Sequence, residues 1–122
     1  MAVLAAVELR PDDRVPVLRL GGEVGIANAR AFREKLTEVV ENRDLGVVID
    51  LSHVTYLDSA GVNVLFEVAE ALRSRQLRMA LVVPERGLVR RVVELVDLVS
   101  VAGVHRSVEA AVAGVREARG TP

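Results

Sequence analysis

One short stretch joins a strongly apolar run to a long helical pattern, and it reads Tyr56-Leu57-Asp58-Ser59-Ala60-Gly61. A serine stands where the helix is expected to begin, and its hydroxyl can accept a hydrogen bond from an unpaired N–H group of the first turn. Gly61 has no side chain, so it lets another backbone segment come close. We therefore predict that Ser59 is the N-cap of a helix that continues to about Gln76.

Composition narrows the class of protein. A chain of 122 residues suffices for one domain with one core, and 51% hydrophobic with 27% charged residues is typical of a soluble globular protein. A net charge of −1 and 2% aromatic residues argue against a nucleic-acid partner. The absence of cysteine excludes disulfides and thiolate chemistry. The first apolar run, 2–7, is too short to insert into a membrane, so we expect a cytoplasmic protein.

The segments before the central stretch have alternating strand and helix patterns. Residues 3–9 and 15–20 should pair as an antiparallel hairpin through a turn at 11–13. A helix should follow, with Asn28 as its N-cap. Its apolar stripe consists of Ala29, Phe32, Leu36, Val39 and Val40. The run 46–51 is apolar on both faces, which is typical of a central parallel strand.

The segments after the central stretch continue this alternation. The helix that follows Ser59 has an inner face made of Gly61, Leu65, Val68, Ala69 and Leu72. Its first turns are also apolar at Val62, Val64 and Phe66, so that end is either deeply buried or in contact with a partner. We then predict a strand over 77–83 and a helix over 86–98 with Leu88, Val92 and Leu95 inward. A strand over 99–104 should follow. Ser107 should cap a last helix, whose inner face is Val108, Ala111, Val112 and Val115.

This order predicts an α/β fold. We expect a single domain over 1–118, with a mixed β-sheet made of the N-terminal antiparallel hairpin and then parallel strands, packed with about four α-helices. A frayed tail should follow at 119–122. In such sheets the carboxyl ends of the strands form the functional edge. Three loops should lie there: 22–28, 52–61 and 84–87.

Catalytic interpretations of these residues are weak. Ser59, His53 and Asp50 or Asp58 include the residue types of a hydrolase triad, but no Gly-x-Ser-x-Gly motif surrounds the serine. His53 and His105 do not have the spacing of metal ligands. We therefore expect no enzymatic activity, no metal and no cofactor.

Other polar residues near Ser59 have structural explanations. Asp50 should cap a turn through Ser52 and His53. Asp58 precedes the expected cap, where a helix dipole favours negative charge. The bare sequence also favours a plain capping role for Ser59. If Ser59 were phosphorylated, the helix N-terminus would stabilise the phosphate, and the fold should survive.

Four segments together resemble one known family. Val47-Val48-Ile49-Asp50-Leu51-Ser52-His53-Val54-Thr55-Tyr56-Leu57-Asp58-Ser59-Ala60-Gly61 resembles the signature segment of STAS domains, as in bacterial anti-sigma factor antagonists. Residues 18–24, 81–84 and 107–111 resemble the family's second strand with its Gly-Glu turn, a later strand and the start of the last helix. The resemblance extends over essentially the whole chain.

The resemblance implies a switch without catalysis. Antagonists of this family bind an anti-sigma factor that is also a serine kinase. This binding releases a sigma factor from the anti-sigma factor. The kinase then phosphorylates the serine after the signature aspartate, here Ser59, and binding is lost until a serine phosphatase restores it. The implied partner-binding residues are Gly25, Ile26, Asn28, Asp58, Ala60, Gly61, Asn63 and Glu67.

One position departs from the antagonists. Where they commonly have an aspartate, this chain has Gly25. This departure supports a second hypothesis, a STAS subunit that regulates or scaffolds another assembly without phosphorylation, such as a lipid-transport ATPase complex or a signalling assembly. A weak homodimer formed through the edge of the hairpin also stays open.

Overall fold

Five strands and four α-helices make up the part of the chain that the computed structural model describes, residues 6–9, 15–40 and 46–120. The strands lie side by side in the order β1-β2-β3-β4-β5. Their bounds are Ala6–Leu9 for β1, Pro16–Val24 for β2, Gly46–Leu57 for β3, Arg78–Val82 for β4 and Gly103–His105 for β5. The helices are α1 (Ala29–Val40), α2 (Ser59–Ser74), α3 (Leu88–Leu95) and α4 (Val108–Gly120), and a 3₁₀ helix, η1, covers Leu98–Ser100.

The predicted α/β class and its four helices are confirmed. β1 pairs with β2 in the antiparallel direction, with Ala6 opposite Arg19, while β2, β3, β4 and β5 are parallel to one another. The turn expected at 11–13 lies outside the described residues. None of the helices within the described ranges is long and apolar enough to cross a membrane.

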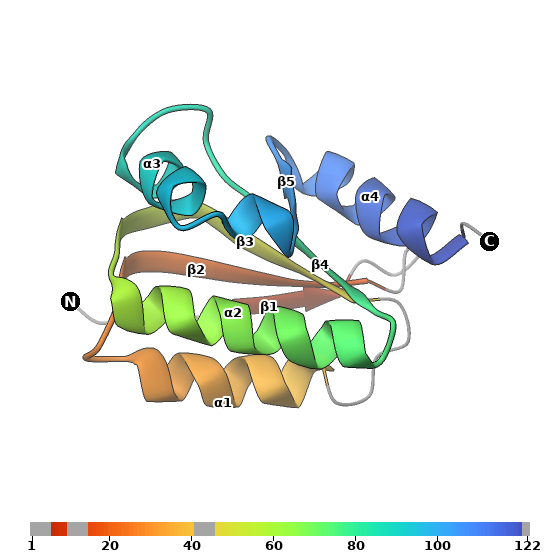
Figure 1. Ribbon diagram of the computed structural model, residues 1–122, viewed down its shortest axis with the longest axis horizontal. Helices are drawn as coiled ribbons and strands as arrows, with labels where there is room; N and C mark the ends of the chain where they lie inside the picture. Colours follow the sequence, from red (N-terminus) through yellow and green to blue (C-terminus); the bar gives the residue numbers. More distant parts are fainter. Residues whose placement is uncertain (1–5, 10–14, 41–45, 121–122) are drawn as a thin grey trace.

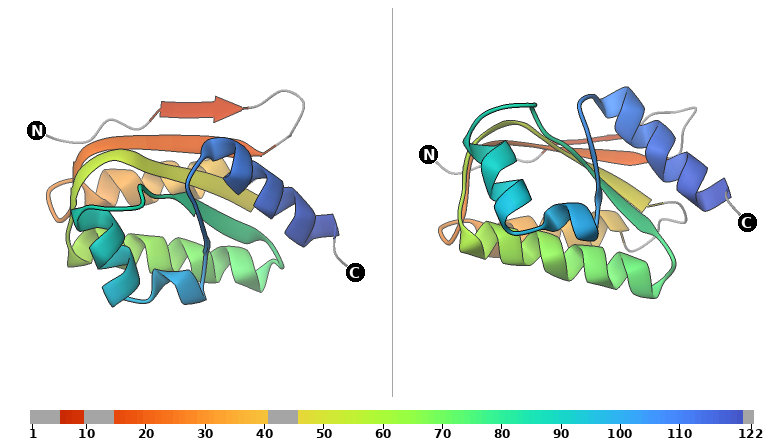
Figure 2. Two further views of the ribbon diagram at one scale, coloured as in Figure 1. Left: turned by 90° about the horizontal axis from the view of Figure 1, so that it is seen from above. Right: turned by 45° about the horizontal axis from the view of Figure 1, so that its top comes forward.

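The sheet separates two apolar layers. α1 and α2 lie side by side along one face, and α4 crosses the other (Figures 1 and 2). Along β3, Val47, Ile49 and Leu51 point into the layer of α1, α2 and α3, and Val48 points into the layer of α4. All four side chains are buried, so β3 is the central strand that its apolar run predicts.

The predicted inner faces of the first two long helices are confirmed. Phe32, Leu36, Val39 and Val40 of α1 are buried, and Ala29 packs against them. All five predicted inner positions of α2 are buried as well. Val62 and Val64 are also buried, which shows that the wide apolar arc at the start of α2 is mostly core. The predicted inner face of α4 packs on the sheet, and Ser107 Oγ accepts a hydrogen bond from Ala110 N (3.1 Å).

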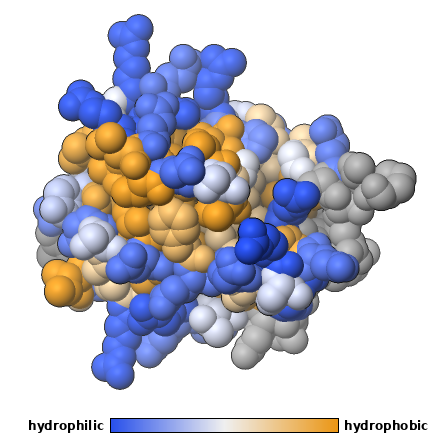
Figure 3. Space-filling view, viewed as in Figure 1, coloured by the Kyte–Doolittle hydropathy of each residue, from blue (hydrophilic) through white to orange (hydrophobic). Residues whose placement is uncertain are grey.

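The prediction for α3 is wrong at its two leucines. Leu88 is 48% exposed and Leu95 is 81% exposed, whereas Val89 and Val93 are buried. The apolar residues of α3 form one wide arc, with Leu88 and Leu95 at one edge and Val89 and Val93 toward the other. Helical periodicity alone therefore cannot choose which edge of the arc is buried. Figure 3 shows the result as an apolar surface on the viewed face, over the region of α3.

The chain after α3 also differs from its prediction. Residues 98–100 form η1, and only Gly103–His105 form the last strand, in place of a strand over 99–104. Asp97, just before η1, has a φ of 61°, which turns the chain sharply. Leu98 is thereby fully buried while Val99 is 50% exposed. The helix α4 continues to Gly120, two residues into the expected tail, and 121–122 lie outside the described residues.

The central strand is longer than predicted, and His53 does not lie in a turn. β3 continues through Ser52 and His53 to Leu57. Pairing with β2 is kept over this stretch, with Gly21 opposite His53 and Val24 opposite Leu57, across two irregularities in the register. Because irregular pairing with β2 still supplies partners for the backbone, polar side chains here do not end the strand.

The buried and exposed edges of the apolar arc of α3 give a direct test of its orientation. Val93→Ala should lower the free energy of unfolding by about 2 kcal/mol, because it removes buried methyl groups and leaves a cavity. Leu95→Ala should change it by less than about 0.5 kcal/mol, because that side chain is in solvent. Urea denaturation measures both. Equal losses in the two variants would contradict the orientation of α3.

Candidate functional site

Asp58, and not Ser59, is the N-cap of α2. Asp58 has an extended backbone, and its Oδ1 accepts hydrogen bonds from Ala60 N (2.9 Å) and Gly61 N (3.2 Å). Its carbonyl oxygen accepts the first intrahelical bond, from Val62 N (2.9 Å). Aspartate is as good an N-cap as serine, and the bond from Asp58 N to Val24 O (3.1 Å) places this residue at the end of the sheet. Ser59 is the first residue of α2 and is exposed.

The same carboxylate holds the loop between β2 and α1. Asp58 Oδ2 accepts a hydrogen bond from Ile26 N (3.1 Å), across 32 positions of sequence. A Cβ atom added to Gly25 would lie less than 3.0 Å from the carboxyl atoms of Asp58, so a side chain here would displace that carboxylate. Gly25 therefore leaves room for the carboxylate in the position that holds the loop.

These contacts favour the ionised form of Asp58. The hydrogen bond from Ile26 N is the largest cause that lowers the pKa of Asp58, desolvation is the next largest cause and raises it, and the bonds from Gly61 N and Ala60 N lower it further. A carboxyl group whose pKa is lower in the folded state stabilises the fold above its unfolded pKa. That contribution is lost as the pH falls through the folded pKa.

Asn28 organises the rest of the loop. Its Oδ1 accepts from Gly25 N (2.9 Å), its Nδ2 donates to Glu23 O (2.8 Å), and its backbone N donates to Gly25 O (3.0 Å). The carbonyl of Asn28 accepts from Phe32 N (3.0 Å), as the residue before a helix does. Asn28 thus has the predicted position at the start of α1, but its side chain is turned back to the loop instead of capping the helix.

Gly61 permits the close approach that its lack of a side chain predicts. A Cβ atom at this position would lie 2.9 Å from Val24 O and 2.9 Å from Leu57 Cδ1. The first turn of α2 therefore packs directly on the ends of β2 and β3. Both Gly25 and Gly61 are buried by their own chain, so they shape the site through the backbone.

The remaining predicted residues share one surface. Ser59, Asn63 and Glu67 are exposed at every fourth position of α2, and Ala60 is half-buried beside them. Glu67 also makes an ion pair with Arg33 of α1 (2.8 Å), which joins the two helices.

A shallow depression of about 360 Å³ lies next to this surface. It is lined by Glu23, Gly25, Ile26, Ala27, Asn28, Tyr56 and Asp58. The structure thus brings together two of the three predicted loops, 22–28 and 52–61. Tyr56, which is 45% exposed, was not among the predicted contact residues. The sequence feature that could have identified Tyr56 as a contact residue is a large aromatic side chain near the end of a strand, shortly before the helix.

Asp50 has a structural role, as predicted, but its hydrogen-bond partner Ser52 lies within strand β3 and not in a turn with His53. Its Oδ1 accepts hydrogen bonds from Ser52 N (2.9 Å) and from the Ser52 hydroxyl, and its Oδ2 lies 3.5 Å from Arg19 Nε. His53 does not take part in these bonds. Within the described residues, no hydrogen bond joins Ser59 to His53, so the residue types of a hydrolase triad are not assembled into one.

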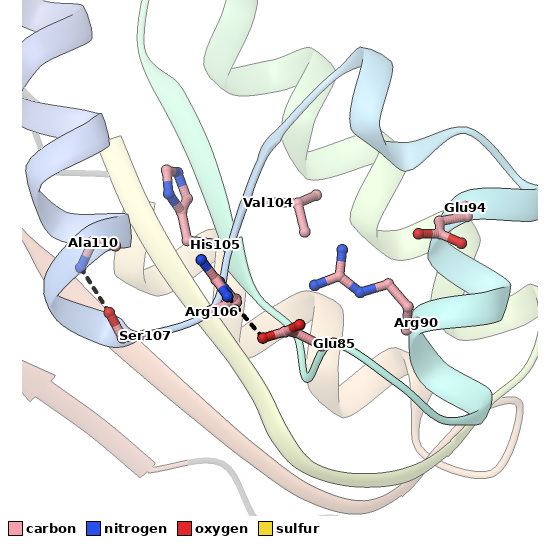
Figure 4. Close-up of a pocket in the computed structure, with 8 residues that line it drawn as sticks. All are labelled: Glu85, Arg90, Glu94, Val104, His105, Arg106, Ser107 and Ala110. Carbon is pink, nitrogen blue, oxygen red and sulfur yellow. Dashed lines mark hydrogen bonds and ion pairs between the residues drawn. The ribbon is translucent and has the colours of Figure 1, made fainter.

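The third loop, 84–87, lines a separate cavity of about 650 Å³ (Figure 4). The charged side chains that line this cavity make hydrogen bonds and an ion pair with neighbouring segments of the protein. Arg90 donates from Nε to Pro84 O (2.8 Å) and from a second nitrogen to Val83 O (3.0 Å). Arg106 pairs with Glu85 at 2.8 Å, which lowers the pKa of Glu85 and raises that of Arg106. These contacts stabilise the loop between β4 and α3.

The role of Asp58 predicts a specific pH dependence. Asp58→Ala should lower the free energy of unfolding at pH 7, because the cap and the loop contact are both lost. The difference from wild type should shrink as the pH falls through the lowered pKa of Asp58. Urea denaturation from pH 7 to pH 2 measures this, with Glu34→Gln on the exposed side of α1 as the control. A deficit that stays constant with pH would contradict the assignment.

Comparisons with known proteins match this geometry to one family. The STAS domain family matches residues 6–111, which include both loops of the site. The anti-sigma-F factor antagonist RsfB of Mycobacterium tuberculosis is 32% identical over 105 residues, which cover 86% of this chain and 84% of RsfB. The protein BtrV of Bordetella bronchiseptica is 36% identical over 107 residues, which cover 87% of this chain and 90% of BtrV.

A solved structure agrees with these relatives. The crystal structure of an anti-sigma factor antagonist from Mycobacterium paratuberculosis superimposes with a TM-score of 0.83 at 27% identity, over 94% of this chain and 95% of that one. The matches of sequence and fold extend over most of the chain. The chain therefore belongs to the STAS domain family, with anti-sigma factor antagonists among its relatives.

Proposed function

We propose that this protein is an anti-sigma factor antagonist that binds an anti-sigma factor with serine kinase activity while Ser59 is unmodified, and that this binding releases a sigma factor. The observation that carries the proposal is the division of roles between Asp58 and Ser59. Asp58 caps α2, and the Ser59 hydroxyl makes no hydrogen bond with any described residue. The hydroxyl is therefore available to a kinase, and the fold does not depend on it.

Phosphorylation fits this position chemically. The γ-phosphoryl group of ATP would be transferred to Ser59 Oγ, which loses its proton, and ADP would leave. The N-terminus of α2 favours a negative group at its first residue. Asp58 would keep its three N–H partners, so the cap and the loop should stay in place. The modified protein should accordingly remain folded.

The loss of binding follows from charge and solvation. A partner in contact with Ile26, Asn28, Asn63 and Glu67 would cover Ser59. A phosphate there would have to lose its water next to the Asp58 carboxylate, which is costly without additional basic groups on the partner. A serine phosphatase that removes the group would restore binding.

Gly25 still supports an alternative function. The missing aspartate supports a STAS subunit that works without phosphorylation in a transport or signalling assembly. In this chain Gly25 leaves room for the carboxylate of Asp58, but antagonists with an aspartate at this position also have the signature aspartate, so this contact does not explain the departure. The choice between the two functions therefore rests on Ser59.

The phosphorylation itself can be measured directly. Incubation with ATP and the kinase-type anti-sigma factor from the same genome should add one phosphate to the wild type, as measured by intact mass. Ser59→Ala should block this addition, while Ser52→Ala should not, because the Ser52 hydroxyl is bonded to Asp50. Labelling that persists in Ser59→Ala would exclude Ser59 as the acceptor.

A charge mimic tests the switch. Ser59→Asp should weaken binding of the anti-sigma factor by about tenfold or more in calorimetry, since a charged group would be buried at the contact. Ser74→Asp, at the exposed far end of α2, is the matched control and should bind as the wild type does. Both variants should keep the circular dichroism spectrum of the folded protein. Equal affinities for Ser59→Asp and wild type would favour the alternative, phosphorylation-independent function.

A further inference from the structure

We propose that Ile26 and Tyr56 form the centre of the partner-binding surface, with Glu23 at its rim. This surface binds a partner segment in which a large apolar side chain lies next to a lysine or arginine. These three residues are called the Ile26 surface below. The inference rests on the proposed function only for the identity of the partner. The chemistry of the partner segment follows from the exposure, rigidity and charge of the surface.

Exposure is the first observation. Ile26 is 84% exposed, the highest value among the large apolar side chains of the described residues, and Tyr56 is 45% exposed. Both line the depression of about 360 Å³ beside Asp58. An apolar side chain that stays in water and borders a depression gains free energy when a partner covers it.

Rigidity is the second observation. The backbone around Ile26 is held by Asp58 Oδ2 at Ile26 N (3.1 Å) and by the three bonds that Asn28 makes to Gly25 and Glu23. The exposure of Ile26 is therefore a consequence of a fixed loop. A surface that is already ordered loses less conformational entropy on binding, which is typical of an anchor residue.

Charge is the third observation. Glu23 and Asp58 are the charged side chains that line the depression, and no basic side chain of the described chain lines it. Asp58 already accepts three hydrogen bonds, whereas the Glu23 carboxylate makes no ion pair with a described residue. One cation on the partner would complement Glu23, and the ring of Tyr56 would attract the same cation.

This arrangement is compatible with a switch at Ser59. A single cation that pairs with Glu23 leaves no counter-charge for a phosphate on the neighbouring helix. Phosphorylation would then add about two negative charges that the partner does not neutralise. The Ile26 surface thus explains how a basic partner segment can bind the unmodified protein and how this binding can be lost after phosphorylation of Ser59.

The exposed apolar side chains of α3 and of the segment after it offer a natural control. Leu88, Leu95, Val96 and Val99 are also exposed, but nothing in the structure indicates what covers them. Leu95 is 81% exposed, nearly as much as Ile26, yet it does not line the depression. A substitution there removes a similar amount of apolar surface without touching the Ile26 surface.

A peptide-display selection tests the inference without a known partner. A library of random peptides is selected on the immobilised full-length protein, and the enriched peptides are measured against variants. We expect enrichment of sequences with Leu, Ile or Phe next to Lys or Arg. Their affinity should fall about tenfold or more for Ile26→Ser and for Glu23→Lys, and stay unchanged for Leu95→Ser. Enrichment of acidic peptides, no enrichment, or equal binding to Ile26→Ser would overturn the inference.

A separate measurement distinguishes this inference from the proposed function. The kinase-type anti-sigma factor is titrated against wild type, Ile26→Ser and Leu95→Ser. If it binds wild type and Ile26→Ser equally, the Ile26 surface is refuted while the proposed function stands. If it binds none of them while the peptides behave as expected, the proposed partner is refuted while the surface stands. Circular dichroism confirms that each variant is folded.

Discussion

The carboxylate of Asp58 connects two segments that lie far apart in the sequence. One oxygen accepts from the first N–H groups of α2, and the other accepts from Ile26 N in the loop before α1. Because a single charged group serves both, the start of α2 and the β2–α1 loop have one fixed relation to each other. Gly25 and Gly61 are adapted to it, since a side chain at either would collide with Asp58 or with Val24 and Leu57.

This interaction separates the capping of α2 from the side chain that is proposed to be phosphorylated. If Ser59 were the N-cap, a group added to its hydroxyl would remove a hydrogen bond that helix α2 needs. With Asp58 as the cap, the first residue of the helix is exposed and its side chain is not used by the fold. The same interaction presents Ile26 to solvent on an ordered loop. The proposed modification site and the proposed apolar anchor are therefore both positioned by one group.

Periodicity in the sequence predicted the elements whose packing is unambiguous. α1 and α2 each have one apolar stripe, and both stripes are buried. α3 has one apolar arc that is wider than the space it packs into, so its orientation depends on which edge of the arc fits beside β3 and η1, and Val93 is buried there while Leu95 is exposed. β3 continues past Ser52 and His53 for a similar reason, since pairing with β2 supplies hydrogen bonds that the local polarity does not reveal.

The sequence by itself determined the α/β class, the order of the elements, the resemblance to STAS domains and the residues that gather around Ser59. These depend on local patterns and on a motif that is continuous along the chain. The tertiary structure alone decided that Asp58 is the cap, that Gly25 faces its carboxylate and that Ile26 and Tyr56 border one depression. The positions of Gly25, Ile26 and Tyr56 depend on contacts such as the one between Ile26 and Asp58 across 32 positions of sequence, which no local pattern encodes. The cap is local, but Asp58 and Ser59 are equally good capping residues, so the sequence could not choose between them. The stretch from Tyr56 to Gly61 therefore identifies the family, and the loop packed against it determines how the site is built.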